Sequence, residues 1–459
     1  MGKAVKVLLK VFGLSVLSGI LIVAIGLVVL NIIWGCQIKD EMAAIKAKGE
    51  PASAADLDRW SIPDDQNGSV VYQQIFKQTS APAVSGDLGT LRKFVTAKEG
   101  ERTPDLRKQA RGALDRCGRL IPLLEQAASR PKCRFRVDHL ALAGGSGFTT
   151  FGKLRGLAFI PCARAILSAE DGKADEAVKS LRLSFRIGES LKDEPMLVPQ
   201  LVRIAITLNS CSALRCVLDH GGINEDQARS LGDAMGTIEL NSGAALAWAG
   251  ERALFMTFVP LMAKGDVRFT RDMLMTESDT GDAGATPFFV HAYALVFGRG
   301  DEAAYLRAMG KLLNSADVPY RDAVYRDRIN GSREEREQVF GIPPYALVTR
   351  ILFPVFLRFG AKKDIASATA IGCRTELALL AYKDRYGVYP ASLGELRAKL
   401  GWKLREDPFS GKDFIYKRQG KGFLLYSIGP NLKDDGGVEP PKKDSHNRDK
   451  GDIVWRMER

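Results

Sequence analysis

Several signatures of enzyme and metal chemistry are missing from this sequence. It has only four histidines, His139, His220, His291 and His446, and none has another histidine four residues away. HExxH and CxxC motifs are absent, so a metalloprotease helix, a zinc ribbon and a redox dithiol are not indicated. The net charge is +12, but no basic run is interleaved with aromatic residues, and we therefore expect no nucleic-acid partner.

Two glycine-containing stretches come close to catalytic motifs without completing them. GFTTFGK, residues 147–153, has the spacing of a phosphate-binding loop, but Leu154 follows where a Ser or Thr would bind Mg²⁺. GGSGF fails the G-x-S-x-G pattern because Phe148 replaces its last glycine. Glu251 lies in the apolar stretch LAWAGERALFMTF and would be an acid of raised pKa if buried, but we expect it on a solvated stripe.

The cysteine content is low for a disulfide scaffold. Six of the seven cysteines follow Cys36, and in an oxidising compartment they could pair in 15 ways, but we expect buried single thiols. The residues around Cys36 loosely resemble a lipoprotein processing site. The bulky Trp34 fits such a site badly, so a free thiol at the membrane interface is the expectation.

The N-terminus carries the clearest positive signal. Residues 11–34 contain no charge and are long enough to cross a bilayer as a helix. Lys3, Lys6 and Lys10 precede this run, whereas Asp40 and Glu41 follow it. By the positive-inside rule, we expect a retained single-pass anchor in a bacterial inner membrane, with a cytoplasmic N-terminus and the rest of the chain extracytoplasmic.

The remainder is predicted to be mainly α-helical. Residues 1–36 are taken as the basic leader and transmembrane anchor, 37–67 as a polar stalk with a short helix at 38–48, 68–360 as an α-helical domain, and 361–459 as a small α+β domain. Apolar periodicity predicts a helix over 105–128 and a helical hairpin over 153–192 broken at Gly172. Further helices are predicted at 196–219, 225–238, 241–263, 300–314, 343–359 and 364–387.

The last domain should combine a helix with a three-stranded antiparallel sheet. DFIYKR (413–418) and FLLYSI (423–428) have the composition of strands, and the Gln-Gly-Lys-Gly between them predicts a hairpin. Asp407-Pro408 and Ser410-Gly411 predict a turn before it. Residues 453–455 would add a third strand, so that the acidic, glycine-rich loop before them becomes a connection held by strands at both ends.

This ending resembles the C-terminal domain of the major pseudopilin of type II secretion systems. The matching residues lie between 364 and 459 and are Tyr382, Gly387, Tyr389, Pro390, Leu393, Leu396, Asp407, Pro408, Gly411, Tyr416, Tyr426, Ser427, Gly429, Gly436, Gly437, Asp452, Ile453 and Trp455. The overall layout is also similar to a group of bacterial membrane-anchored proteins, through stretches such as IPDDQNGSVVYQQIF, CRFRVDHL and SLKDEPMLVPQLVRIA. This second resemblance implies no enzymatic activity.

The pseudopilin resemblance implies a calcium ion in the loop. The corresponding ligands here are Asn431, Asp434, Asp435 and Asp452, with a carbonyl such as that of Ser427. Asn431 stands where an aspartate is usual, so the affinity should be in the ~10⁻⁴–10⁻³ M range of extracellular modules. The alternative is a mobile turn without a metal.

These features together predict a non-enzymatic envelope protein that is structural or binds another envelope protein. The hairpin at 153–192 is a candidate partner surface, although helix packing alone also explains its pattern. The alternative is an extracytoplasmic hydrolase with its site in the helical domain. A deep pocket lined by Glu251, His220 or His139 would favour that alternative.

Overall fold

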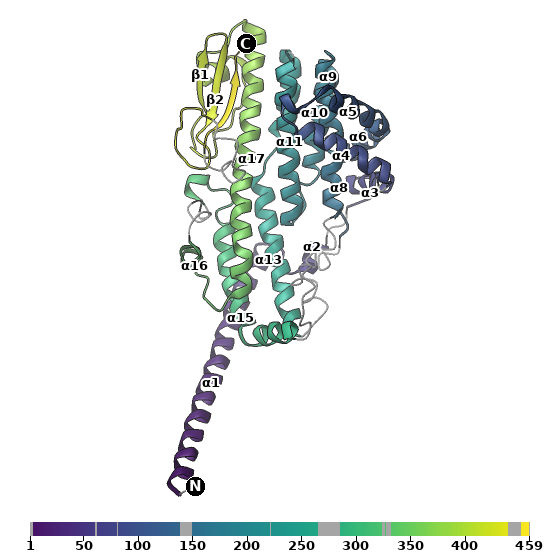
Figure 1. Ribbon diagram of the computed structural model, residues 1–459. Coiled ribbons are helices and arrows are strands. Elements are labelled where there is room, and N and C mark those ends of the chain that lie inside the picture. The colour runs from purple at the N-terminus through teal and green to yellow at the C-terminus, as the bar shows by residue number, and fades with distance from the viewer. Residues whose placement is uncertain are drawn as a thin grey trace.

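The computed structural model describes residues 3–59, 62–79, 81–137, 149–220, 222–264, 285–323, 326, 332–438 and 451–458. It is mainly helical and has one three-stranded antiparallel sheet near the C-terminus, which confirms the fold class expected from the sequence. One long helix, α1, projects from the rest of the fold, which we call the body (Figure 1). The two chain termini lie at opposite ends of the molecule.

Helix α1 (Lys3–Ala47) is continuous. The short helix predicted at 38–48 is therefore the last part of α1 and not a separate element, because no proline interrupts the chain between Trp34 and Ala47. The chain leaves the helix at Gly49, which has a positive φ of 69°. The stretch Lys10–Ala47 reaches a mean hydropathy of 2.8 and none of that apolar window is buried, so α1 is a candidate membrane-crossing segment or signal sequence.

Short helices form one side of the body. They are α2 (Ala54–Leu57), α3 (Gly68–Thr79), α4 (Pro82–Thr96), α5 (Pro104–Cys117), α6 (Ile121–Ser129) and α8 (Thr149–Leu157). The single helix predicted over 105–128 is divided into α5 and α6 by a 3₁₀ turn at Gly118–Leu120. Pro122 explains the division, because it cannot donate a backbone hydrogen bond to the preceding turn.

Longer helices form the centre of the body. The predicted hairpin is confirmed as α9 (Phe159–Glu170) and α10 (Ala174–Glu189), with Gly172 at a φ of 74° in the turn. Helices α11 (Leu197–His220), α12 (Glu225–Gly236) and α13 (Asn241–Ala263) lie close to their predicted ranges. Helix α11 is also long and apolar enough to cross a membrane, but 56% of its apolar window is buried inside the body, so it is a core helix.

Two helices are longer than predicted. Helix α15 (Ala285–Leu313) begins before the predicted 300–314 segment, and α16 (Arg333–Phe340) follows it. Helix α17 (Leu347–Tyr386) replaces the two helices predicted at 343–359 and 364–387, so the predicted domain boundary at 360/361 falls within it. The helix continues through Pro354 because that residue removes only one hydrogen bond while the neighbouring Phe353 and Phe356 are buried.

The C-terminal sheet packs on the second half of α17. After α18 (Leu393–Leu400), strands β1 (Ile415–Gln419), β2 (Gly422–Ser427) and β3 (Ile453–Met457) pair in the order β1-β2-β3, as the sequence predicted. Trp455 of β3 is buried against α17 and donates its indole N–H to the Cys373 Sγ at 3.4 Å. Gly372 leaves the space for this ring, because a Cβ there would overlap Trp455.

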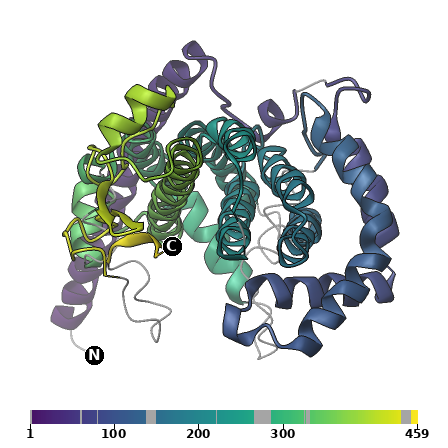
Figure 2. The same ribbon diagram turned by 90° about the horizontal axis from the view of Figure 1, so that it is seen from above.

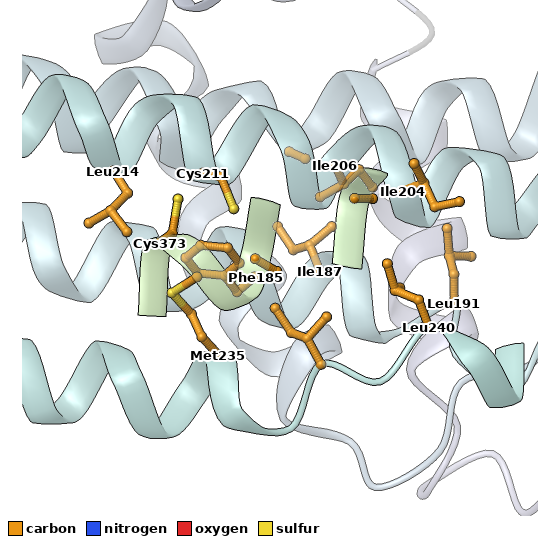
Figure 3. Close-up of a cluster of buried hydrophobic side chains, with 14 of the residues drawn as sticks. Phe185, Ile187, Leu191, Ile204, Ile206, Cys211, Leu214, Met235, Leu240 and Cys373 are labelled. Atoms are coloured by element: carbon orange, nitrogen blue, oxygen red, sulfur yellow. The ribbon is translucent and has the colours of Figure 1, made fainter. Parts of the chain in front are cut away.

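One hydrophobic core joins the helices to the sheet. It extends from Val71 of α3 to Trp455 of β3. Figure 3 shows its centre, where Phe185 and Ile187 of α10 meet Cys211 of α11 and Cys373 of α17. Seen from above, the blue helices of residues 68–129 and the yellow sheet lie on opposite sides of these central helices (Figure 2). The C-terminal module is therefore built into the body and shares its core.

Candidate functional site

The loop expected to bind calcium is held by its own hydrogen bonds. Asp452, just before β3, accepts the backbone N–H of Gly437 at 2.7 Å and that of Asp435 at 3.4 Å. Asp434 accepts the Tyr426 hydroxyl and the Gly436 N–H, each at 2.9 Å. These contacts connect the loop to β2 on one side and to the start of β3 on the other.

The remaining predicted ligands also have protein partners. Asn431 donates its side-chain amide to Asp435 at 2.8 Å. The Ser427 hydroxyl donates to Asp407 at 2.8 Å, which links β2 to the turn that precedes the sheet. The structure thus brings Asn431, Asp434, Asp435 and Asp452 into one loop, while the Ser427 side chain is used by the Asp407 turn.

The charges in this loop respond differently to their surroundings. Burial raises the pKa of Asp452, and the nearby Asp435 and Asp434 add to the rise. The Gly436 N–H and the Tyr426 hydroxyl lower the pKa of Asp434. Within the described ranges, no three His, Cys, Asp or Glu side chains gather as a metal site. The hydrogen bonds alone explain the shape of the loop, and calcium binding stays a prediction.

A buried polar cluster joins three stretches that are distant in the sequence. Asn67 bonds both the N–H and the carbonyl of Arg134 at 3.0 Å. Arg134 donates to the carbonyls of Leu57 and Asp193, each at 2.8 Å. Glu194 is fully buried, accepts the Phe135 N–H at 2.8 Å, and has a pKa raised by burial to about 7. This cluster fixes the entry into α3 and α11, and its role is structural.

The two proposed catalytic groups that the structure describes, Glu251 and His220, do not converge. Glu251 is half-buried and its carboxylate accepts the Leu197 N–H at 2.9 Å, so its assignment to a solvated stripe was wrong. Burial raises the pKa of Glu251 to about 7. The contact caps the first residue of α11. It could not be predicted from the sequence, because Leu197 is 54 residues away from Glu251. His220 bonds the Cys216 carbonyl at 2.8 Å, and His139 lies outside the described residues.

The seven cysteines carry free thiols. Five of them are buried, Cys216 is half-buried and Cys36 is exposed on α1. In Figure 3 the Cys211 and Cys373 sulfurs point toward each other from α11 and α17. Burial raises the pKa of the Cys162 thiol to about 11, which makes it unreactive as a nucleophile at neutral pH.

Three neighbouring clefts form a continuous hollow along α10, which we call the α10 trough. Their volumes are about 710, 410 and 440 Å³. Arg182 and Arg186 line both the first and the second cleft, and Glu125 and Lys179 line both the second and the third. Helix α12 forms the opposite wall of the first cleft, and α6 borders the other two. Neither Glu251 nor His220 lines any of these three clefts.

The trough is lined by charges of both signs. On α10, Lys179, Arg182 and Arg186 follow an i, i+3, i+7 spacing and lie on the exposed face. On α12, Asp226 and Asp233 line the same cleft as the two arginines, together with Arg229, which is paired with Glu225 at 3.1 Å. Lys179 is paired with Glu125 at 2.9 Å. Arg182 and Arg186 form no ion pair within 4.0 Å with any residue the structure describes, so the two walls face each other without closing.

Sequence reasoning located this surface only in part. The hairpin at 153–192 was named as a candidate partner surface, and α10 supplies one wall of the trough. The contribution of α12 could not be predicted, because α11 separates it from α10 in the chain and the contact of Gln227 with Asp175 spans 52 residues. In the comparisons with known proteins, no family model, no curated protein and no solved structure matches this chain.

Proposed function

We propose that the protein is a non-enzymatic envelope scaffold, anchored in a bacterial inner membrane by residues 11–34, whose extracytoplasmic body binds a partner protein in the α10 trough. The observation that carries the binding role is that Arg182 and Arg186, which form no ion pair with any described residue, line an open cleft together with Asp226 and Asp233. A partner segment with carboxylates toward Arg182 and Arg186 and a basic group toward Asp226 and Asp233 would satisfy both walls. Charge-assisted hydrogen bonds to such groups contribute about 1.5–3 kcal/mol each.

Two features of α1 support the anchor. Its large apolar side chains are exposed in all directions, from Leu8 at 75% to Ile33 at 45%. Such a surface is stable only in an apolar surrounding. The basic residues before residue 11 and the acidic ones after residue 36 favour a cytoplasmic N-terminus.

The geometry around α11 argues against the rival hydrolase. Glu251 caps the first residue of α11, whereas His220 is its last residue. At a rise of about 1.5 Å per residue, the two ends of this 24-residue helix lie about 35 Å apart. A general base and an acid must both reach the reacting atoms, so these two groups cannot serve one site.

The anchor is tested by reporter fusions after residue 59 and by protease treatment of intact spheroplasts. We expect an extracytoplasmic reporter signal and cleavage of the body. A protected body would refute the orientation.

The trough is tested by photo-cross-linking in whole cells from a benzophenone amino acid at Ser230, which lines the first cleft. We expect a defined adduct that the double variant Arg182→Glu, Arg186→Glu loses. Arg92→Glu, an exposed residue of α4 outside the trough, is the matched charge control and should keep the adduct. An adduct that persists unchanged in the double variant would refute the binding role.

A further inference from the structure

We propose that the end of the body beside α1 is itself a lipid-binding surface, with exposed apolar side chains of α15 and α17 inserted into the outer leaflet. We call this surface, formed by Leu295, Leu347 and Ile351, the base. The inference rests on the proposed anchor. It goes further by assigning a membrane contact to the body, which the predicted span at 11–34 does not include.

Contacts between α1 and the body fix the height at which the body begins. Asn31 donates to the Val296 carbonyl at 3.4 Å. Trp34 packs on Tyr345 with 5.1 Å between ring centroids, and it lies against Gly300. The body therefore starts beside residue 31 of α1, before the apolar run ends at residue 34.

The length of the anchor places this height at the membrane surface. Residues 11–30 alone would cross about 30 Å as a helix, which is the thickness of the hydrocarbon core. Ile32 and Ile33 continue the apolar surface and are 60% and 45% exposed. At the same level, Asn31 and Trp34 contact Val296 and Gly300 of the body. Lipid that shields these two isoleucines must also reach the adjacent surface of the body.

Three exposed apolar side chains of the body lie near that level, and Val355 continues their stripe along α17. Leu295 is 57% exposed and adjoins Val296, which contacts α1. Leu347 and Ile351 are 45% and 69% exposed, are one helical turn apart, and follow Tyr345, which contacts Trp34. Figure 1 shows the lower ends of α15 and α17 beside the point where α1 leaves the body.

The surroundings of the base suit a membrane interface. Tyr293, Phe297 and Tyr345 are half-buried. The ring centroid of Phe297 lies 6.0 Å from that of Tyr293 and 6.0 Å from that of Tyr345. Aromatic residues with a polar tip are enriched at the boundary between lipid and water. Arg299 is exposed beside Gly35 of α1, where its guanidinium can reach lipid phosphates. Continuity with α1 is what favours lipid over a second copy of the chain.

The test uses the full-length protein in vesicles of phosphatidylethanolamine and phosphatidylglycerol that contain doxyl-labelled lipid. Single cysteines labelled with an environment-sensitive nitrobenzoxadiazole dye are introduced as Leu295→Cys and Ile351→Cys in a Cys36→Ser parent. The parent alone measures labelling of the half-buried Cys216. Val388→Cys is the matched control, because Val388 is also 57% exposed but lies just beyond the far end of α17.

We expect the dyes at positions 295 and 351 to be quenched several-fold more strongly than the dye at 388. A dye on Leu21→Cys, in the middle of the span, separates the two proposals. Quenching at 21 but not at 295 or 351 would overturn the lipid-binding base and leave the anchor intact. Absence of quenching at 21 would overturn the anchor and the base with it. Shielding at 295 and 351 that depends on protein concentration, without quenching, would mean that a second copy covers this face and would also overturn the proposal.

Discussion

The end of the body beside α1 and the end that carries the α10 trough differ in what they expose. Beside α1, the exposed side chains include Leu295, Leu347 and Ile351, whereas along α10 they are charged. Both ends belong to one fold with a shared hydrophobic core. An apolar surface can be stable only in lipid or in an interface, but a charged trough requires water or a charged partner. The proposed membrane attachment and the proposed partner binding therefore use two surfaces of different chemistry.

The largest effect is expected from breaking the packing that joins the two ends. Gly250 of α13 lies against Pro195, and a Cβ there would overlap the Pro195 carbonyl. We expect Gly250→Ala to lower the free energy of unfolding by about 3 kcal/mol, because overpacked backbone cannot move aside. Urea unfolding in detergent micelles, followed by tryptophan fluorescence, measures it.

Gly86→Ala is the control for this substitution. Gly86 lies in α4, and no other atom lies within 4 Å of the position that a Cβ would take. Alanine should therefore stabilise that helix by up to about 1 kcal/mol. Equal stability of the Gly250 and Gly86 variants would show that the α13 contact does not hold the ends together.

The second prediction tests whether partner binding in the α10 trough can be removed without changing the lipid contact of the base. Arg182→Glu with Arg186→Glu should reduce cross-linking from Ser230 at least tenfold, since two charge-assisted contacts are reversed. Both arginines are exposed and form no ion pair with a described residue, so the free energy of unfolding should change by less than about 0.5 kcal/mol. Lipid quenching at position 351 should be unchanged. Loss of quenching together with cross-linking would show that the two surfaces are coupled.

Sequence reasoning succeeded where the signal was local. The apolar run of α1, the Gly172 turn and the hairpin of β1 and β2 depend on residues that are neighbours in the chain. Helix α13 occupies its predicted range, because polar Asn241 begins it and a long apolar pattern continues it. These elements needed no knowledge of the tertiary fold.

Predictions from the sequence were wrong or incomplete where contacts with distant segments determine the local structure. Two helices were predicted, at 343–359 and 364–387, but α17 is continuous between them, where Phe359 and Gly360 are buried. Glu251 suggested an exposed stripe, but its carboxylate caps α11 through Leu197. The α10 trough needs α12 as a second wall, and the calcium loop depends on which donors its carboxylates meet. Leu197 is 54 residues from Glu251, α11 separates α12 from α10, and Gly437 is 15 residues from Asp452.

The buried polar cluster between the two ends makes stability depend on pH. The pKa of Glu194 is about 7 in the folded protein because burial disfavours its charge, against a usual value of 4.5. The folded state therefore holds a proton more tightly than the unfolded state between these values. The stabilisation is complete below about pH 4.5 and is lost as the pH rises through 7, by an amount on the order of 3 kcal/mol.

Glu194→Gln should make this dependence shallower without removing it. Glutamine still accepts the Phe135 N–H but cannot ionise, whereas Glu251, Glu302 and Glu376, whose pKa values are also raised to about 7 by burial, still titrate. Urea unfolding at several pH values between 5 and 8 measures the slope. Glu225→Gln is the control: burial raises its pKa, but Arg385 and Arg229 outweigh this and lower it, so both states are ionised over this range. An unchanged slope in the Glu194 variant would mean that its carboxyl titrates normally.

The smallest effect concerns the loop before β3. If calcium binds with a Kd near ~1 mM, then ~10 mM calcium should stabilise the fold by only about 1.4 kcal/mol. Asp452→Ala should abolish that gain, but it also removes the acceptor for the Gly437 N–H, so the variant starts from a lower stability. The informative quantity is therefore the difference in stability with and without calcium within each variant, measured by thermal unfolding.

Two controls accompany this test. Asp115→Ala, which changes an exposed residue of α5, should keep the full calcium-dependent gain in stability, and magnesium should give no gain. An equal shift with magnesium, or one that survives in the Asp452 variant, would leave the loop as a structure held only by its hydrogen bonds.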